Sequence, residues 1–289
     1  MSERWTGLQT TVPQRRKGSD LKTSKTDDTT TIPTKKPWPR TSILASQVVK
    51  KVRSLNLEYW KVYTSDKWIL ETVVEYQIEF TQTPFQNRIP REIPFPDDQT
   101  CLFSQEVDNL LRMGAIEIVP KFDDQFISTF FVVLKKDAPC RPVINLKFLN
   151  EYVQYYHLKQ ENLNFALDLI QPTDYLTKLD LKDAYFHVKI HKDYKTFLCF
   201  PWKGILYCFT VLPFGQASAP RVFTKLLRPI SATFIQNGIR CCFYIDDSLM
   251  MNQDKLKCKS ESLLVTQEME NLGFTINETK SVLIPTQRL

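Results

Sequence analysis

The sequence predicts an α+β fold in which helices back one face of an antiparallel β-sheet and leave the other face open. Two apolar runs flank Asp246 and Asp247, a pattern typical of a tight β-hairpin with both carboxylates at its tip. Asp180 lies in an apolar-alternating stretch that indicates a strand. Two long helices are expected among these strands, at residues 217–237 and 256–272.

Positive charge is concentrated at the start of the 289-residue chain. Residues 1–53 carry twelve Lys or Arg against four Asp or Glu, and the net charge of the whole chain is +6, which leaves −2 for the remainder. The basic balance therefore gives no evidence that the folded part binds nucleic acid. Because residues 1–42 are rich in Thr, Ser, Lys and Pro, we expect a disordered basic tail there.

The first half of the folded part is expected to combine short helices with hairpin strands. A helical pattern at residues 43–63 opens an N-terminal extension, residues 43–89, that is partly helical. Ser104 and Gly114 are the expected N-cap and stop of a helix that ends at Met113. Beyond it, the patterns predict two strands and a helix, at residues 126–135, 140–146 and 162–170.

The second half is expected to supply the remaining strands. Residues 196–200 and 205–211 form a hairpin before the first long helix. Asp254 and Gly273 are the expected cap and stop of the second long helix. A strand at residues 274–277 follows that helix.

The cysteine and hydropathy patterns indicate the cellular compartment in which the protein is expected to reside. The seven cysteines include no Cys-x-x-Cys pair and most lie in apolar strands, so buried free thiols are expected and a structural zinc is not. No apolar run approaches about 18 residues and no signal-peptide core is present, so we expect no membrane association and a cytosolic or nuclear protein. His187 and His191 have no third ligand and are expected to be surface residues.

Asp180, Asp246 and Asp247 form the candidate catalytic centre. Taken alone, an Asp-Asp pair is more often a solvated turn. An unpaired carboxylate inside a strand is costly to bury, however, so Asp180 needs a cation. Two Mg²⁺ ions about 3.5–4 Å apart, clamped by carboxylates from separate strands, suit the attack of a hydroxyl on a phosphoryl group, and Mn²⁺ is a possible substitute.

A further block, Val211–Pro220, reads Val-Leu-Pro-Phe-Gly-Gln-Ala-Ser-Ala-Pro and precedes an amphipathic helix. Together with Asp180 and the Tyr244–Asp247 (YxDD) motif, it makes residues 90–289 resemble the reverse transcriptases of retroelements. Gln216 stands where close relatives often carry Leu. Within the family, three stretches are similar to the DIRS-like (tyrosine-recombinase) retrotransposons, namely residues 126–129, 180–188 and 207–211.

The resemblance implies a reverse-transcriptase-like palm and fingers over residues 90–289, with the Trp-containing extension packed on the fingers. It also implies an RNA-directed DNA polymerase that joins a dNTP to a primer 3′ hydroxyl on an RNA or DNA template. A non-catalytic, nucleic-acid-binding scaffold and an RNA-directed RNA polymerase are the alternatives. The chain ends about where the family's primer grip begins. We therefore expect a chain truncated before the thumb, with thumb and RNase H regions in the full element. Processive synthesis by this polypeptide alone is expected to be weak or absent.

By the same resemblance, Asp180 and Asp246 are the shared ligands of both Mg²⁺ ions, and Asp247 supports them with less direct contact. The Leu181 carbonyl completes the coordination. Lys280 is the candidate general acid that protonates the leaving pyrophosphate. The alternative for Lys280 is an ordinary charged residue after a strand.

Two groups of residues are implied to hold the triphosphate. Lys136 and Arg141 flank the turn of the fingers hairpin, where Arg offers a planar fork and Lys a compact charge. Lys135 could replace Lys136, because the turn length varies in the family. Asp183 and Ala184 would offer backbone N–H groups to the phosphates.

Three further residues are implied to contact the sugar or the template. A ring at Tyr185 would collide with a 2′-OH, so the enzyme would prefer deoxynucleotides. The alternative is that Tyr185 is an ordinary strand residue. Phe214 and Gly215 lie where the family contacts the nucleotide sugar and template, and Gly permits close backbone approach.

Overall fold

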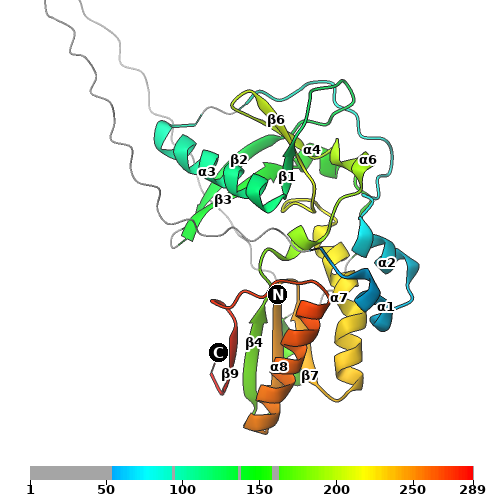
Figure 1. Ribbon diagram of the computed structural model, residues 1–289, viewed down its shortest axis with the longest axis vertical. Helices are drawn as coiled ribbons and strands as arrows, with labels where there is room; N and C mark the ends of the chain where they lie inside the picture. Colours follow the sequence, from blue (N-terminus) through cyan, green and yellow to red (C-terminus); the bar gives the residue numbers. More distant parts are fainter. Residues whose placement is uncertain (1–53, 93–94, 136–137, 158–162, 289) are drawn as a thin grey trace, which may run out of the picture. The chain divides into compact units, whose positions relative to one another are not determined.

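The computed structural model describes residues 54–92, 95–135, 138–157 and 163–288 (Figure 1). All of them belong to the unit Gln47–Leu289. The predicted basic tail, residues 1–42, lies outside the described residues. No helix in the described ranges is long and apolar enough to cross a membrane.

A four-stranded antiparallel sheet, called the palm sheet below, has the strand order β7-β8-β4-β9 (Figure 1). Its strands are β4 (Tyr175–Asp180), β7 (Arg240–Tyr244), β8 (Asp247–Asn252) and β9 (Val282–Thr286). Two long helices pack against it, α7 (Ala219–Gln236) and α8 (Lys255–Asn271). The predicted combination of an antiparallel sheet with covering helices is confirmed.

The fingers contain two smaller sheets and their helices. The hairpin sheet is β2 (Thr129–Lys135) with β3 (Ala138–Asn145), and the order of the other sheet is β1 (Ile116–Ile118), β6 (Ile205–Phe209) and β5 (Cys199–Trp202). The accompanying helices are α3 (Asp97–Met113), α4 (Lys147–Asn150) and α6 (Lys192–Lys195). Helix α5 (Leu163–Leu169) contacts β7 of the palm sheet, and the 3₁₀ helix η1 (Ala184–His187) follows β4. Stacked aromatic rings form much of their core, including Phe103 on Trp202 and Phe130 on Phe200.

The N-terminal extension forms helices α1 (Leu57–Tyr63) and α2 (Lys67–Val74). Trp60 of α1 is fully buried, and its indole Nε1–H donates to the carbonyl of Leu272, at the end of α8, over 3.0 Å. The expectation that this segment packs on the fingers is therefore wrong for α1. Beyond α2 the chain does reach the fingers, where Phe80 bridges to Val153.

Gly273 makes this docking possible. Its φ of +101° lies in the region that favours glycine, and a Cβ there would lie 2.5 Å from the carbonyl oxygen of Ser54. The neighbouring backbone N–H of Asn56 donates to Leu272 O over 3.0 Å. A helix stop predicted from the sequence is thus also the contact point of the extension.

Two predicted elements have different bounds. Helix α3 begins at Asp97, after Pro96, so Ser104 lies inside it and its hydroxyl donates to the Thr100 carbonyl. The strand expected at residues 274–277 is wrong, because only Ile276 forms a bridge, with Leu181. Strand β9, which follows eight residues after Phe274, is the true edge of the palm sheet.

The expectation of free thiols is wrong for two cysteines. Cys199 and Cys208 are directly opposite each other on β5 and β6, with Cα atoms 4.0 Å apart, and form a disulfide. Spacing along the chain could not indicate this pair, because strand register creates it. Cys241, Cys242 and Cys258 are buried, as expected, and Cys258 keeps its thiol.

A buried ion pair fixes the start of β4. The Asp174 carboxylate is 1% exposed, and Arg240 of β7 binds it with two N–H groups, at 2.5 and 2.8 Å. Hydrogen bonds from Arg240 hold the pKa of Asp174 below its ordinary value. The pair therefore stabilises the fold fully above the unfolded pKa of about 3.9, and this stabilisation is lost as pH falls through the folded pKa.

We expect Asp174→Asn to lower the free energy of unfolding by about 2–4 kcal/mol at pH 7, because it leaves a guanidinium largely buried without its partner. The difference from wild type should shrink at pH 3. Urea unfolding at both pH values measures this. Asp168→Asn, at an exposed carboxylate of α5, is the control and should change stability by less than about 0.5 kcal/mol. An equal loss at pH 3 and pH 7 would contradict the ion-pair explanation.

Candidate active site

A two-residue turn between β7 and β8 carries Asp246. Tyr244 pairs with Asp247 across the hairpin, so only Ile245 and Asp246 lie in the turn. Ile245 has a φ of +53°, which is strained for a β-branched residue and costs about 1–3 kcal/mol. The flanking ladder holds this conformation, and the hairpin predicted from the sequence is confirmed.

Asp180, the last residue of β4, is directly opposite Asp247 in the palm sheet. Opposite residues of an antiparallel pair have Cα atoms about 4.5–5.5 Å apart and side chains on the same face. The N–H of Leu181 donates to the carbonyl of Asp246 over 2.8 Å, which ties the turn to the end of β4. Strand register therefore brings Asp180 together with Asp247, 67 residues later in the sequence.

The segment between α8 and β9 lies beside Asp180 and forms hydrogen bonds with it. The Asn277 N–H donates to the Asp180 carbonyl over 2.8 Å, and the Asp180 N–H donates to the Ser281 hydroxyl over 3.0 Å. The Asn277 side chain also forms a hydrogen bond with the Asp180 carboxyl. Sequence analysis missed Asn277 and Ser281, which have no pattern to mark them.

The carboxylates repel one another. Asp180 is 4% exposed, and burial, with added contributions from Asp247 and Asp246, raises its pKa. Asn277 and Lys280 act in the opposite direction and partly offset this effect. Lys280 is exposed, yet it is close enough for its charge to reach Asp180.

Lys178 is a further member of the site that sequence analysis missed. Its Nζ lies 2.8 Å from Oδ1 of Asp247, and this contact raises the pKa of Lys178. Lys178 and Asp180 are two apart in β4 and so point to the same face. This two-residue spacing is the feature of the sequence from which Lys178 could have been predicted to lie at the site.

The residues present fit a hard divalent cation. Carboxylate oxygens are the ligands that Mg²⁺ prefers, and a cation would relieve the repulsion at Asp180. In the described ranges, no group of three or more His, Cys, Asp or Glu side chains is arranged to hold a metal ion. Asp247 pairs with Lys178 instead, so metal binding would require this ammonium to move or to share the carboxylate.

Tyr185 lies in η1 rather than in a strand, so its alternative explanation as an ordinary strand residue is wrong. Asp183 precedes η1 with a φ of +50°, and Ala184 and Tyr185 are buried. The Tyr185 ring lies 5.1 Å from the ring of Phe214 and 5.6 Å from that of Phe223. Burial, with a contribution from nearby Asp246, raises the pKa of Tyr185 to about 12.

Gly215 lies where the fingers meet the palm. It has a φ of +97°, and a Cβ there would lie 3.2 Å from the carbonyl oxygen of Ile144 in β3. The side chain of Asn150 binds this loop from α4, donating to Gly215 O and accepting from Ala217 N–H, both over 2.9 Å. The loop that carries Phe214 is therefore attached to the fingers.

The predicted triphosphate contacts are only partly described. Arg141 lies in β3, opposite Val133, and Lys136 lies outside the described residues. The fingers hairpin exists as predicted, with β2 and β3 antiparallel. Its assignment to a triphosphate stays a prediction.

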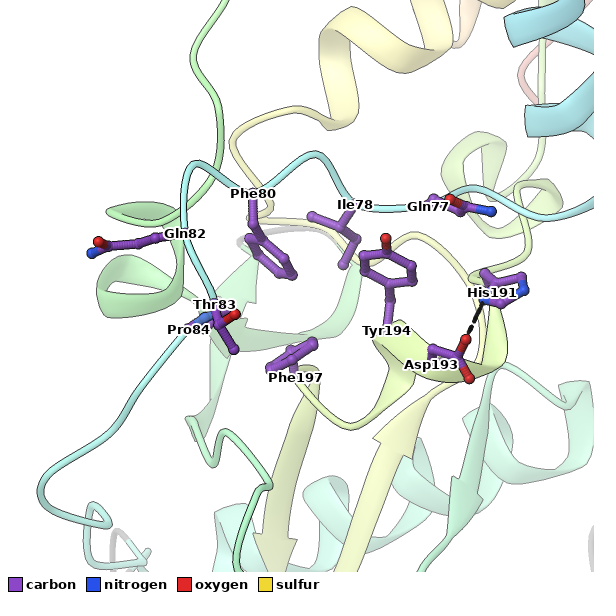
Figure 2. A pocket seen from close by; sticks show the side chains of 10 residues that line it. All are labelled: Gln77, Ile78, Phe80, Gln82, Thr83, Pro84, His191, Asp193, Tyr194 and Phe197. Atoms are coloured by element: carbon purple, nitrogen blue, oxygen red, sulfur yellow. Dashed lines mark hydrogen bonds and ion pairs between the residues drawn. The ribbon is translucent and has the colours of Figure 1, made fainter.

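The two histidines lie in different places. His187 is 2% exposed, so the expectation that it is a surface residue is wrong. His191 caps α6 and lies 3.6 Å from Asp193 in a cavity of about 450 Å³ (Figure 2). Figure 2 shows Phe80, Tyr194 and Phe197 lining the same cavity, which lies among the segments that join the extension to the fingers.

Comparison with known proteins gives a consistent result. The family model described as "Reverse transcriptase (RNA-dependent DNA polymerase)" matches residues 133–288. Transposon Tf2-3 and Tf2-4 polyproteins of Schizosaccharomyces pombe are each 27% identical over 210 residues, which is 72% of this chain and 15% of the polyprotein. The chain thus spans about 15% of the length of these curated relatives.

Solved structures of similar fold come from foamy virus. The native prototype foamy virus protease-reverse transcriptase has a TM-score of 0.60 at 19% identity, over 71% of this chain and 27% of that one. The foamy viral enzyme in complex with dsDNA has a TM-score of 0.60 at 20% identity, over 72% and 42% of the two chains. At such identities the similarity concerns the fold.

We expect Asp180→Asn to leave the free energy of unfolding unchanged or to raise it by about 1 kcal/mol, because it removes a buried, mutually repelled charge. Chemical denaturation at pH 7 without divalent ions measures this. Asp174→Asn, at the other end of β4, is the contrasting variant, since it removes a paired charge. A loss of stability at Asp180→Asn as large as that at Asp174→Asn would indicate a structural role for the Asp180 carboxylate.

Proposed function

Because the chain belongs to the reverse transcriptase (RNA-dependent DNA polymerase) family, we propose that its acidic centre joins a deoxynucleotide to a primer 3′ hydroxyl on an RNA or DNA template. The observation that carries the proposal is the pairing of Asp180 with Asp247 beside the Asp246 turn, at one end of the palm sheet. Phosphoryl transfer needs positioning and charge neutralisation more than covalent chemistry.

The acidic side chains have separate roles in this proposal. Two bound Mg²⁺ ions would activate the primer hydroxyl and stabilise the leaving pyrophosphate. Asp180 and Asp246 would hold them, with the Leu181 carbonyl as a further oxygen ligand, and Asp247 would add negative charge. Lys280 donates a proton to the pyrophosphate, and its electrostatic effect on Asp180 supports its presence at the site.

The remaining residues position the nucleotide. Lys136 and Arg141 bind the triphosphate from the fingers, and the N–H groups of Asp183 and Ala184 bind it from the palm. The Tyr185 ring lies under the sugar, supported by its packing on Phe214.

The proposed binding partners are nucleic acids, as in the proteins to which this chain is similar. Foamy viral relatives were solved with dsDNA and with an RNA/DNA hybrid, and we propose that this chain likewise holds a template-primer duplex. The similarity to Tf2 polyproteins supports an origin in a retrotransposon. A DIRS-like affiliation is proposed on the three sequence stretches alone. The division into an extension at residues 43–89 and a palm and fingers at residues 90–289 is proposed on the same basis.

We expect Mg²⁺-dependent incorporation of dTTP on poly(rA)/oligo(dT) by the full chain, and a loss of at least about a thousandfold in Asp246→Asn. Primer extension resolved by gel measures this. Asp168→Asn should keep wild-type activity. Extension that persists in Asp246→Asn would contradict the assignment. A folded wild type that binds the duplex without extending it would favour the non-catalytic scaffold.

We expect Tyr185→Ala to accept ribonucleotides, with the ratio of dNTP to rNTP incorporation falling by about tenfold or more, because the ring no longer meets the 2′-OH. Single-nucleotide kinetics with dTTP and UTP measure this. Tyr185→Phe is the matched control, since it keeps the ring and should keep the ratio. An RNA-directed RNA polymerase would instead use both substrates already in wild type. Thermal melting shows whether Tyr185→Ala is folded.

A further inference from the structure

His187 connects the 3₁₀ helix η1 to the segment between α8 and β9. Its Nδ1 lies 3.2 Å from the carbonyl oxygen of Ala184, in the same helix. The backbone N–H of Thr275 donates to its Nε2 over 3.0 Å, and the Thr275 hydroxyl, 3.2 Å away, can donate to the same nitrogen. The imidazole is 2% exposed, so water does not compete for these bonds.

The two partners determine which nitrogen carries the proton. A backbone N–H can only donate, so Nε2 of His187 must accept from Thr275. A carbonyl can only accept, so Nδ1 must donate to Ala184. Both requirements are met by one neutral tautomer, with its proton on Nδ1.

Thr275 is itself attached to the acidic centre. The Lys182 N–H donates to its carbonyl over 2.8 Å, and its neighbour Ile276 bridges to Leu181. The bond through His187 therefore joins η1 to the chain that follows Asp180. A single turn of 3₁₀ helix has poor hydrogen-bond geometry of its own and benefits from such a side-chain bond.

The N-terminal extension packs behind this connection. Phe274 is fully buried, with ring centroids 6.1 Å from Trp60 of α1 and 5.4 Å from His187. Phe223 contacts Phe274 at 5.8 Å and Tyr185 at 5.6 Å. A continuous set of rings thus runs from the extension to the residue proposed to select the sugar.

We propose that His187 is a positioning residue for sugar selection: its bond to the Ala184 carbonyl sets the place of the adjoining Tyr185 ring. This inference rests on the proposed function. It assigns a role to a buried histidine that is not among the proposed metal ligands. It also gives helix α1 a role, because Trp60 supports the Phe274–Thr275 segment to which the imidazole is bound.

Two substitutions test the two sides of the imidazole separately, because each can keep the hydrogen bonding of one ring nitrogen and lose that of the other. In His187→Asn, the amide Nδ2 can occupy the place of Nδ1 and keep the bond to Ala184. In His187→Gln, the longer side chain can bring its oxygen to the place of Nε2 and keep the bond to Thr275. His187→Asn loses both contacts of Nε2 with Thr275, His187→Gln loses the contact of Nδ1 with Ala184, and both lose ring volume, so the pair separates the two sides of the imidazole.

We expect His187→Gln to raise the KM for dTTP and to lower the dTTP-to-UTP ratio by about tenfold, with kcat for dTTP within about threefold of wild type. His187→Asn should keep the ratio within about threefold. Asp174→Asn, at the end of β4 opposite to Asp180, is the destabilised control and should change the melting temperature without changing the ratio. Single-nucleotide kinetics and thermal melting of all four proteins measure this.

The inference would be overturned if His187→Asn and His187→Gln had equal dTTP-to-UTP ratios. It would also be overturned if Asp174→Asn lowered this ratio together with the melting temperature. An inactive wild type would instead contradict the proposed function. In that case, imidazole ¹⁵N NMR of the wild type tests the arrangement directly. A proton on Nδ1 supports the bond to Ala184, and a proton on Nε2 overturns it.

Discussion

The burial of one carboxylate, Asp180, next to two others is the constraint on which the arrangement of the acidic site depends. Asp180 is buried beside Asp246 and Asp247, and its raised pKa reports the cost. Two lysines offset part of that cost. Lys178 of β4 pairs with Asp247, and the charge of Lys280, just before β9, acts on Asp180. These two ammonium groups therefore balance part of the negative charge at the site.

Rigid surroundings hold the charged groups in place. The turn at Ile245 and the residue before η1, Asp183, both have positive φ without being glycine. Such conformations persist only where neighbouring structure determines them. Here the β7–β8 ladder fixes the turn, and hydrogen bonds from Leu181 and Asn277 hold the end of β4. Two of the four positive-φ residues other than glycine in the described ranges, Asp183 and Ile245, thus lie near the acidic end of β4.

Sequence reasoning found what depends on local pattern. The acidic hairpin, the two long helices and the fingers hairpin follow from periodicity and turn residues, and the structure contains them. It missed what depends on register or tertiary contact. The disulfide between Cys199 and Cys208, the pairing of Lys178 with Asp247, and burial of His187 all arise between residues brought together by the fold. Strand β9 was missed because its alternation is interrupted by Pro285.

The hydrogen bond from Trp60 to Leu272 joins residues 212 positions apart. The ribosome synthesises α1 long before the end of α8, so the large apolar side chain of Trp60 stays exposed until α8 has been made. Closing so long a loop is slow, and the exposed indole is a potential site of aggregation until it is closed. The order in which the chain is made, and not only its final stability, therefore sets how readily this protein reaches its native state.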